Sequence, residues 1–227
     1  MLLADMTLAQ SQPDSVFGLA VRGGVMMIPI AICSLIVVTV VLERLSVLRV
    51  RRIVPPTFEE ELHRTINARG ADAGEAMCDA DGSPIARTIA AGLRSLPLGH
   101  DVVERQLASA GETEVHTLRK WLRSLSVIAA VAPLLGLTGT IFGMIRAFQT
   151  VASSGESLGK AELLAGGIYE AMISTAAGLL VAIPTIVLYH YLSARIERIA
   201  RELDRVAVGF VQRYALGLPA ATPTASA

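Results

Sequence analysis

The segment AMISTAAGLLVAIPTIVLYHYL, residues 171–192, decides the fold class, because it contains no Asp, Glu, Lys or Arg. A helix needs about 20 mainly apolar residues to cross roughly 30 Å of hydrocarbon. The whole chain has the same character, with 52% hydrophobic residues, 18% charged residues and a mean hydropathy of +0.54. Soluble domains carry about a quarter charged residues. The sequence therefore predicts an integral membrane protein and argues against an ordinary soluble enzyme.

Two further segments are apolar enough to cross a membrane. One runs from about Val25 to Leu42, and the other lies between Arg123 and Arg146. Each of the three segments contains a proline, which membrane helices tolerate. We therefore predict an all-α integral membrane protein with three transmembrane helices.

Lysine and arginine residues near the ends of the spans predict the orientation, because these residues collect on the cytoplasmic side. One side has only Arg22, Arg146 and Lys160. The other side carries a larger set: Arg44, Arg49, Arg51, Arg52, Arg119, Lys120, Arg123, Arg195, Arg198 and Arg201. The N-terminus is expected outside, and residues 43–123 and the C-terminus inside.

The inner segment is expected to be a helical domain. Helices are predicted at 56–70, 71–84 and 84–96, each closed by glycine or proline. From Asp101 the helical spacing runs without a breaker into the second span, so we expect one long helix there. The third span is expected to continue inward as a helix to about Tyr214. Spans two and three therefore extend into the cytoplasmic helical domain.

The expected organisation has eight parts. They are an N-terminal amphipathic segment (1–20), transmembrane helix 1 (21–43), a cytoplasmic helical domain (44–123), transmembrane helix 2 (124–147), a short outer loop (148–161), transmembrane helix 3 (162–192), a cytoplasmic helix (193–215) and a disordered tail (216–227).

Spans two and three each have one face of small and polar residues. At 100° per residue, the face of span two covers an arc of about 100° and that of span three about 140°. Simple helix packing would explain the glycines, but not the hydroxyl groups. The two faces consist of Ala129, Ala132, Gly136, Gly139, Thr140, Gly143 and Ala147, and of Glu170, Ala171, Ser174, Thr175, Gly178, Val181 and Ala182. Several copies in a ring could turn both faces toward a wet path, so we expect a homo-oligomer.

Glu170 is the most informative single residue. A charge in hydrocarbon costs several kcal/mol, and membrane carboxylates commonly mark ion or proton paths. The alternative is an interfacial glutamate favoured by the dipole at a helix N-terminus. No basic residue in a span core is expected to pair with it, so water, a hydroxyl group or another chain should stabilise it.

Other kinds of site find no support. The two cysteines and four histidines are scattered without metal-ligand spacing, so neither a metal nor a cofactor is expected. Nucleotide-binding and hydrolase motifs are absent from the sequence. A net charge of zero argues against nucleic-acid binding. An enzymatic function is therefore not expected.

Two stretches carry a family resemblance: APLLGLTGTIFGMIRAF, residues 132–148, and GIYEAMISTAAGLLVAIPTIVLYHYL, residues 167–192. They resemble the MotA/TolQ/ExbB proton-channel family, and the three spans with a large inner insert are closest to ExbB and TolQ. The resemblance is specific over about residues 125–192. It implies a bacterial inner-membrane protein with a periplasmic N-terminus and a cytoplasmic C-terminus.

The resemblance also implies partners and functional residues. Five copies would surround two copies of a single-span ExbD- or TolR-type protein, and the proton gradient would act through a TonB- or TolA-like protein. The family's functional residues match Thr140 in GTIFG, Thr175 in ISTA and Glu170 in GIYEA. Ser174 shares their face and joins the expected proton pathway. The packing or pore-lining set is Ala132, Gly136, Gly139, Gly143, Ala171, Gly178 and Ala182.

Several alternatives stay open at this point. Relatives usually carry an apolar residue where this chain has Thr138, whose side chain points about 160° away from that of Thr140. The subfamily, ExbB or TolQ, and the ion, proton or sodium, are therefore not fixed. A secondary transporter would usually show internal repeats or broken helices, and neither is visible. A membrane scaffold would explain the glycines but not the polar residues of the two faces.

Overall fold

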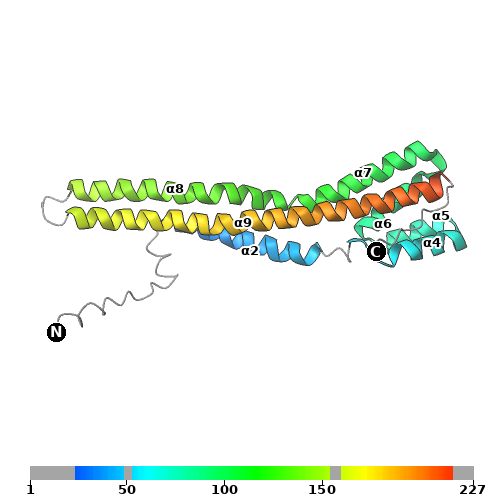
Figure 1. The fold of residues 1–227 in the computed structure, drawn as a ribbon, viewed down its shortest axis with the longest axis horizontal. Helices are drawn as coiled ribbons and strands as arrows, with labels where there is room; N and C mark the ends of the chain where they lie inside the picture. Colours follow the sequence, from blue (N-terminus) through cyan, green and yellow to red (C-terminus); the bar gives the residue numbers. More distant parts are fainter. Residues whose placement is uncertain (1–23, 49–52, 154–159, 217–227) are drawn as a thin grey trace, which may run out of the picture. The chain divides into compact units, whose positions relative to one another are not determined.

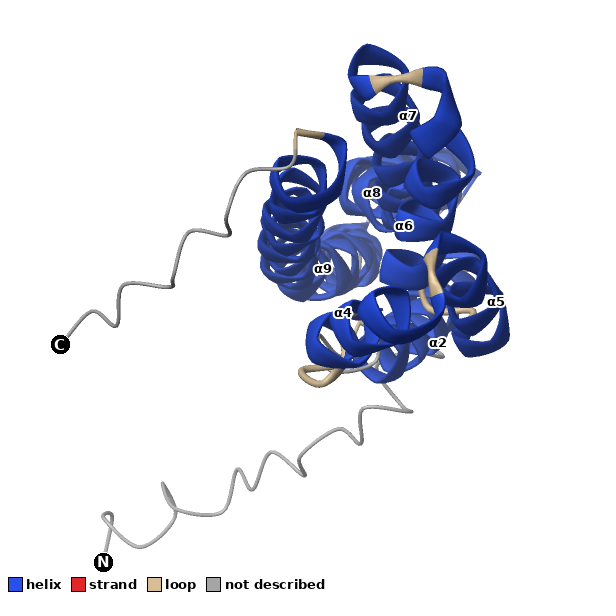
Figure 2. Cartoon of the chain, turned by 90° about the vertical axis from the view of Figure 1, so that its right-hand side faces the viewer, coloured by secondary structure: helices blue, strands red, loops and turns tan. Residues whose placement is uncertain are grey.

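The computed structural model describes residues 24–48, 53–153 and 160–216. Every element in these ranges is a helix (Figure 2). Figure 1 shows their order: α2 (Met27–Val47), α4 (Phe58–Arg69), α5 (Ala71–Asp81), α6 (Pro84–Ser95), the 3₁₀-helix η1 (Leu96–Leu98), α7 (His100–Arg119), α8 (Leu122–Ser153), α9 (Lys160–Phe210) and the π-helix η2 (Val211–Ala215). The prediction of an all-helical chain is confirmed for this part of the protein.

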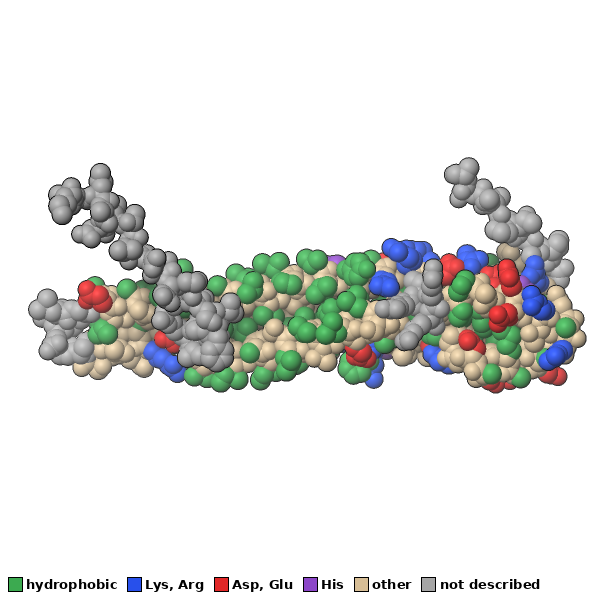
Figure 3. All heavy atoms as spheres, turned by 90° about the horizontal axis from the view of Figure 1, so that it is seen from below, with side chains coloured by type: hydrophobic (Ala, Val, Ile, Leu, Met, Phe, Trp, Pro, Cys, Tyr) green, Lys and Arg blue, Asp and Glu red, His purple; other side chains and the backbone are tan. Residues whose placement is uncertain are grey.

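Three helical segments within the described residues are long and apolar enough to cross a membrane: Met27–Val47, His100–Ser153 and Ala161–Ala215. They include the predicted second and third spans and overlap most of the first, which is expected to begin before Met27. The chain divides into two compact units, one of Met1–Thr39 with Leu125–Val187 and the other of Val40–Ser124 with Leu188–Ala227. We call them the hairpin unit and the bundle unit. In Figure 3 hydrophobic side chains dominate the visible surface of the hairpin unit, whereas charged side chains gather over the bundle unit.

The hairpin unit is built on the antiparallel pair of α8 and the first half of α9 (Figure 1). Their facing surfaces consist of small residues, which let the two backbones approach closely. A Cβ atom added at Gly178 would lie 2.6 Å from the carbonyl oxygen of Ala132 and 3.2 Å from the Cα atom of Gly136. The large side chains of both helices point outward, and Leu134 and Leu180 are 60% and 73% exposed. The unit therefore presents apolar side chains on the surface where lipid would lie.

Helix α6 is the central helix of the bundle unit. Ser83 caps its N-terminus by accepting the N–H of Ala86, and Pro84 occupies the first turn, where its missing N–H is not needed. Ile85 and Ile89 are fully buried, and burying a side chain of this kind stabilises by about 1.5–3 kcal/mol. Arg87 of α6 forms two hydrogen bonds of 2.7 and 2.6 Å to the Glu114 carboxylate of α7. The predicted stops at Gly70 and Gly82 are confirmed.

His63 of α4 contacts the C-terminal end of the bundle unit. Its Nδ1 atom lies 2.7 Å from the Tyr214 hydroxyl, and the two rings are 5.6 Å apart. The Tyr214 ring also packs against Phe210, at 5.2 Å between centroids. Burial and the charge of Arg213 lower the pKa of His63 below its ordinary value, with Glu59 opposing them. Burial and the nearby Arg213 charge therefore favour the neutral imidazole.

The structure differs from the expected helices in two places. The helix from Asp101 into span two is interrupted at Lys120 and Trp121, between α7 and α8. No glycine or proline marks this interruption, so its sequence carries no breaker. At this interruption the guanidinium of Arg44, a residue of α2, lies 5.6 Å from the centroid of the Trp121 ring.

The second difference concerns the loop predicted at 148–161. Helix α8 continues to Ser153 and α9 begins at Lys160, so both ends of that range are helical. The helical continuation of span three to about Tyr214 is confirmed, although the last turn is a π-helix. The N-terminal segment 1–20 and residues 217–227 of the predicted tail lie outside the described residues.

Candidate functional site

The sequence-predicted residues lie on α8 and α9 of the hairpin unit. The antiparallel register brings Gly136 to Ser174 and Thr175, and Gly143 to Ala171. An added Cβ atom at Gly136 would lie 2.8 Å from the Ser174 carbonyl oxygen, and one at Gly143 would lie 2.7 Å from the Ala171 Cβ atom. Motif residues that are distant in sequence therefore meet along one helix–helix contact.

The small residues of the two faces pack mainly against each other within the same chain. Ala132, Ala171 and Ala182 are at most 3% exposed. The Ser174 side chain also occupies the space in which a Gly139 Cβ atom would lie. The small faces pack against each other here, so they do not by themselves require further copies of the chain.

Ser174 and Thr175 both bridge α9 to α8 through one carbonyl group. The Ser174 hydroxyl lies 3.2 Å from the Gly136 carbonyl oxygen, and the Thr175 hydroxyl lies 3.1 Å from it. Ser174 also donates to the Ala171 carbonyl at 2.7 Å and is 1% exposed. Thr175 is half-buried. Ser174 is therefore a packing hydroxyl, whereas Thr175 keeps an open side.

Thr140 lies on the same contact but makes a separate hydrogen bond. Its hydroxyl donates to the Leu137 carbonyl of its own helix at 2.6 Å, and the residue is half-buried. Thr140 follows Gly136 by four residues, or about 6 Å along the helix axis. The structure thus brings the two threonines to neighbouring levels of the hairpin without a hydrogen bond between them.

Glu170 immediately precedes Ala171 in α9 and is half-buried. It lines a cavity of about 230 Å³ together with Arg146, the only other ionisable residue in its lining. Arg146 lies at the end of span two rather than in its core, and no ion pair within 4.0 Å joins it to Glu170 among the described residues. The contact between Gly143 and Ala171 explains why both residues reach the cavity, because Arg146 follows Gly143 by about one turn and Glu170 precedes Ala171.

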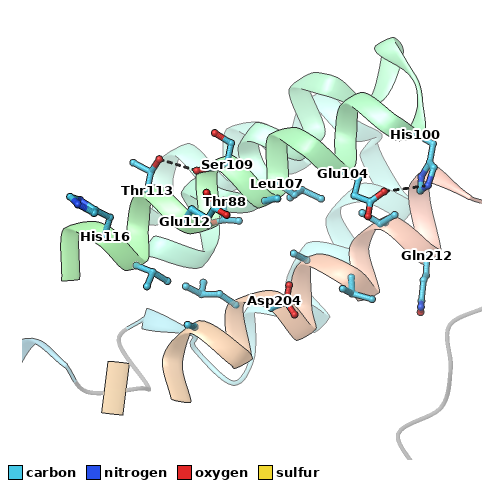
Figure 4. Close-up of a pocket in the computed structure, with 18 of the residues that line it drawn as sticks. Thr88, His100, Glu104, Leu107, Ser109, Glu112, Thr113, His116, Asp204 and Gln212 are labelled. Atoms are coloured by element: carbon cyan, nitrogen blue, oxygen red, sulfur yellow. Dashed lines mark hydrogen bonds and ion pairs between the residues drawn. The ribbon is translucent and has the colours of Figure 1, made fainter. Parts of the chain in front are cut away.

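The bundle unit has a larger groove, which no sequence pattern predicted. It encloses about 980 Å³ between α7 and the second half of α9 (Figure 4). His100 and Glu104 lie at one end, 3.8 Å apart, and Asp204 projects from the opposite helix. Apolar side chains such as Leu107 and Val208 also line it. The groove is larger than the cavity beside Glu170, and both have acidic and basic residues in their lining.

Comparisons with known proteins identify the family to which the chain is similar. The model of the family described as the MotA/TolQ/ExbB proton channel family matches residues 80–205, a range that includes Thr140, Glu170 and Thr175. The ExbB-like 3 biopolymer transport protein of Synechocystis is 36% identical over 172 residues, which cover 72% of this chain and 78% of that protein.

Two other relatives match over shorter ranges. The Tol-Pal system protein TolQ of Haemophilus influenzae is 37% identical over 98 residues, or 43% of this chain and 42% of that protein. The biopolymer transport protein ExbB of Neisseria gonorrhoeae is 37% identical over 86 residues, or 38% of each chain. The match thus spans less than half the length of these two relatives.

Proposed function

The chain belongs to the MotA/TolQ/ExbB proton channel family, as a membrane-embedded subunit of the ExbB/TolQ type, and on that premise we propose that it is a ring-forming part of a motor driven by the proton-motive force. It would work with a single-span ExbD- or TolR-type partner. The motor would energise TonB-dependent transport across an outer membrane.

One observation carries this proposal: Thr175 bridges α9 to Gly136 of α8, Thr140 lies one turn after Gly136, and Glu170 lines a cavity with Gly139 and Gly143 of α8. Polar groups are expensive inside a membrane and commonly serve ion pathways. Both threonine hydroxyls donate to carbonyl groups of the chain, at 2.6 and 3.1 Å. Their oxygen lone pairs are therefore free to accept a hydrogen bond. An acidic group of the partner helix, once protonated, would find acceptors at these two levels.

The hydroxyl groups also suit the other protonation state of such an acid. A hydroxyl can rotate to donate as well as accept, so either threonine could turn toward a carboxylate or hold a water molecule. Glu170 would lie toward the outer side of the membrane and set the local field where protons enter. Ser174 would take part only through packing, because its hydroxyl is buried and already bonded.

The proposed assembly is a homopentamer in a bacterial inner membrane. The N-terminus would be periplasmic and the C-terminus cytoplasmic, as the lysine and arginine residues near the spans favour. The bundle unit would then lie in the cytoplasm. The partner helices would occupy the centre of the ring. There the sides of Thr140 and Thr175 that remain exposed in the single chain would face them.

A TolQ-type role in the Tol–Pal envelope system is the second candidate. The match to TolQ of Haemophilus influenzae favours it, at 37% identity over 98 residues. The longer match to ExbB-like 3 of Synechocystis favours the ExbB role. The proposed chemistry of the hairpin is the same in both, so the two candidates differ in the protein that receives the force.

Reconstitution into liposomes tests the proposed function. Vesicles containing this protein alone, and vesicles that also contain a single-span ExbD- or TolR-type protein of the same genome, are given a pH gradient. We expect the gradient to decay quickly only when both proteins are present. Rapid decay with this protein alone would favour a self-sufficient transporter, and slow decay in both cases would favour a scaffold.

A further inference from the structure

The cavity beside Glu170 joins three segments of the hairpin unit. Its walls come from the residues just before α2, from about two turns of α8 and from α9. Most of the lining is apolar or glycine: Gly24, Val25, Met26, Gly139, Phe142, Gly143 and Ala171. A volume of about 230 Å³ has room for several water molecules, since each occupies about 30 Å³ in the liquid.

Glycine at position 24 gives the Glu170 carboxylate its space. Gly24 has φ +72°, a conformation that favours glycine, and a Cβ atom there would lie 2.8 Å from Oε1 of Glu170. The carboxylate thus reaches the beginning of α2 while its other side borders the cavity. Two helices and the start of a third therefore fix where this charge lies.

Arg146 brings the opposite charge to the same cavity. Neither Arg146 nor Glu170 has an ion pair within 4.0 Å among the described residues. Two opposite charges that border one small, mostly apolar cavity attract each other more strongly than they would in bulk water. Because the Arg146 guanidinium and the Glu170 carboxylate are not in direct contact, water has space between them. A bridging water molecule is enthalpically nearly as good as a direct hydrogen bond.

We propose that this cavity is a hydrated charge-pair site in which Arg146 orients the Glu170 carboxylate through bridging water. Arg146 is then a positioning residue for the outer end of the pathway. Its relevance to proton movement rests on the proposed function, but the pairing itself does not. The ligand of the site is water held between a guanidinium and a carboxylate.

A double-variant cycle in lipid nanodiscs tests the pairing without any transport assay. The variants are Arg146→Gln, Glu170→Gln and the two combined, and the readout is the midpoint of thermal unfolding. Each single change leaves one charge uncompensated, whereas the double change leaves none. The double variant should therefore shift the midpoint no more than either single variant does. A shift equal to the sum of the two single shifts would overturn the proposal.

Matched controls separate pairing from general charge effects. Glu162→Gln changes an exposed glutamate of α9 that does not line the cavity, so its effect should simply add to that of Arg146→Gln. Arg146→Lys keeps the positive charge and should retain most of the wild-type midpoint. If a neutral variant fails to fold, the exchange of Arg146→Glu with Glu170→Arg replaces it. The exchanged double variant should have an unfolding midpoint close to that of the wild type. A midpoint no higher than that of Arg146→Glu or Glu170→Arg alone would contradict the pairing.

Discussion

The Thr175 hydroxyl donates to the carbonyl oxygen of Gly136 at 3.1 Å, across the contact between α9 and α8. In an α-helix that carbonyl also receives the N–H of residue 140. One peptide group of α8 thus connects the side chain of one functional threonine with the backbone of the other. A change in helix packing at Gly136 would therefore move both hydroxyl groups together.

Removing the Thr175 hydroxyl should have a small effect on stability. In Thr175→Val the Gly136 carbonyl keeps its helical partner, so we expect a loss of about 0.5–1.5 kcal/mol, the usual net value of one hydrogen bond. For a chain of this size that corresponds to a fall in Tm of roughly 1–6 °C. Circular dichroism in nanodiscs measures it, and Thr175→Ser, which keeps a hydroxyl, is the control. Complete unfolding of the valine variant would show that the hydroxyl holds the hairpin together.

Gly178→Ala should disturb the hairpin far more than the same change at Gly166. The added methyl group would lie 2.6 Å from the Ala132 carbonyl oxygen and 3.2 Å from the Gly136 Cα atom, so backbone must move. We expect a destabilisation of about 1–3 kcal/mol.

Gly166 is the matched control for this prediction, because it also lies in α9 and a Cβ atom there has no neighbour within 4 Å. Gly166→Ala should be neutral or stabilise by up to about 1 kcal/mol through helix propensity. Unfolding midpoints of the two variants decide the matter. Equal midpoints would contradict the close packing of α8 and α9.

The contact between His63 and Tyr214 should make the bundle unit less stable in mild acid. The pKa of His63 in the folded protein is lowered from its ordinary value of 6.5 by burial and by Arg213. The unfolded chain therefore binds the proton more readily, so stability is lost as the pH falls below about 6.5 toward the lower folded value. Unfolding midpoints between about pH 7.5 and pH 5.5 measure this loss.

The control variant for this prediction is His63→Gln, which cannot take up the proton. It should remove that part of the pH dependence, whereas Tyr214→Phe, which keeps the ring contacts, should retain much of it. A wild-type midpoint that rises on acidification would contradict the assigned direction of the pKa change.

Cys78 should resist alkylation in the native protein. The residue is fully buried in the bundle unit, and burial, with the charges of Asp79, Asp81 and Glu75, raises the pKa of its thiol to about 12. The thiolate is the reactive form, so iodoacetamide near neutral pH should modify Cys78 only after denaturation.

A thiol introduced nearby provides the comparison for Cys78. Ala80 lies in the same helix and is exposed, so Ala80→Cys combined with Cys78→Ser should be modified quickly in the native state. Mass spectrometry of the peptides gives both rates. Equal rates at positions 78 and 80 would show that the core of the bundle unit is open.

Much of the architecture follows from sequence patterns that depend on local physics. The three apolar spans, the glycine stops at Gly70 and Gly82 and the Ser83–Pro84 helix start are properties of short stretches, and the structure has them all. The small faces of spans two and three were also visible as helical arcs. Helical periodicity shows which residues share a face, so the meeting of Gly136 with Thr175 follows once the two helices are antiparallel.

The features that the sequence missed depend on how helices meet. The arcs could not tell whether a small face packs within the chain or between copies, and the structure uses Gly178 within the chain. Arg146 is a flanking charge in the sequence, and only the register of α8 and α9 places it at the cavity that Glu170 lines. The interruption at Lys120 and Trp121 has no glycine or proline to reveal it.

The most direct test of the whole account is proton flux through the assembled complex containing Thr140→Val and Thr175→Val, singly and together. These changes keep the side-chain shape and remove only the hydroxyl groups. The variants are co-reconstituted with the single-span partner, and native mass spectrometry confirms the oligomer before flux is measured. We expect the variant complexes to assemble like the wild type and to lose proton flux. Fully assembled double-valine complexes with wild-type flux would show that both hydroxyls serve packing alone. That result would contradict a role of Thr140 and Thr175 in the proton pathway.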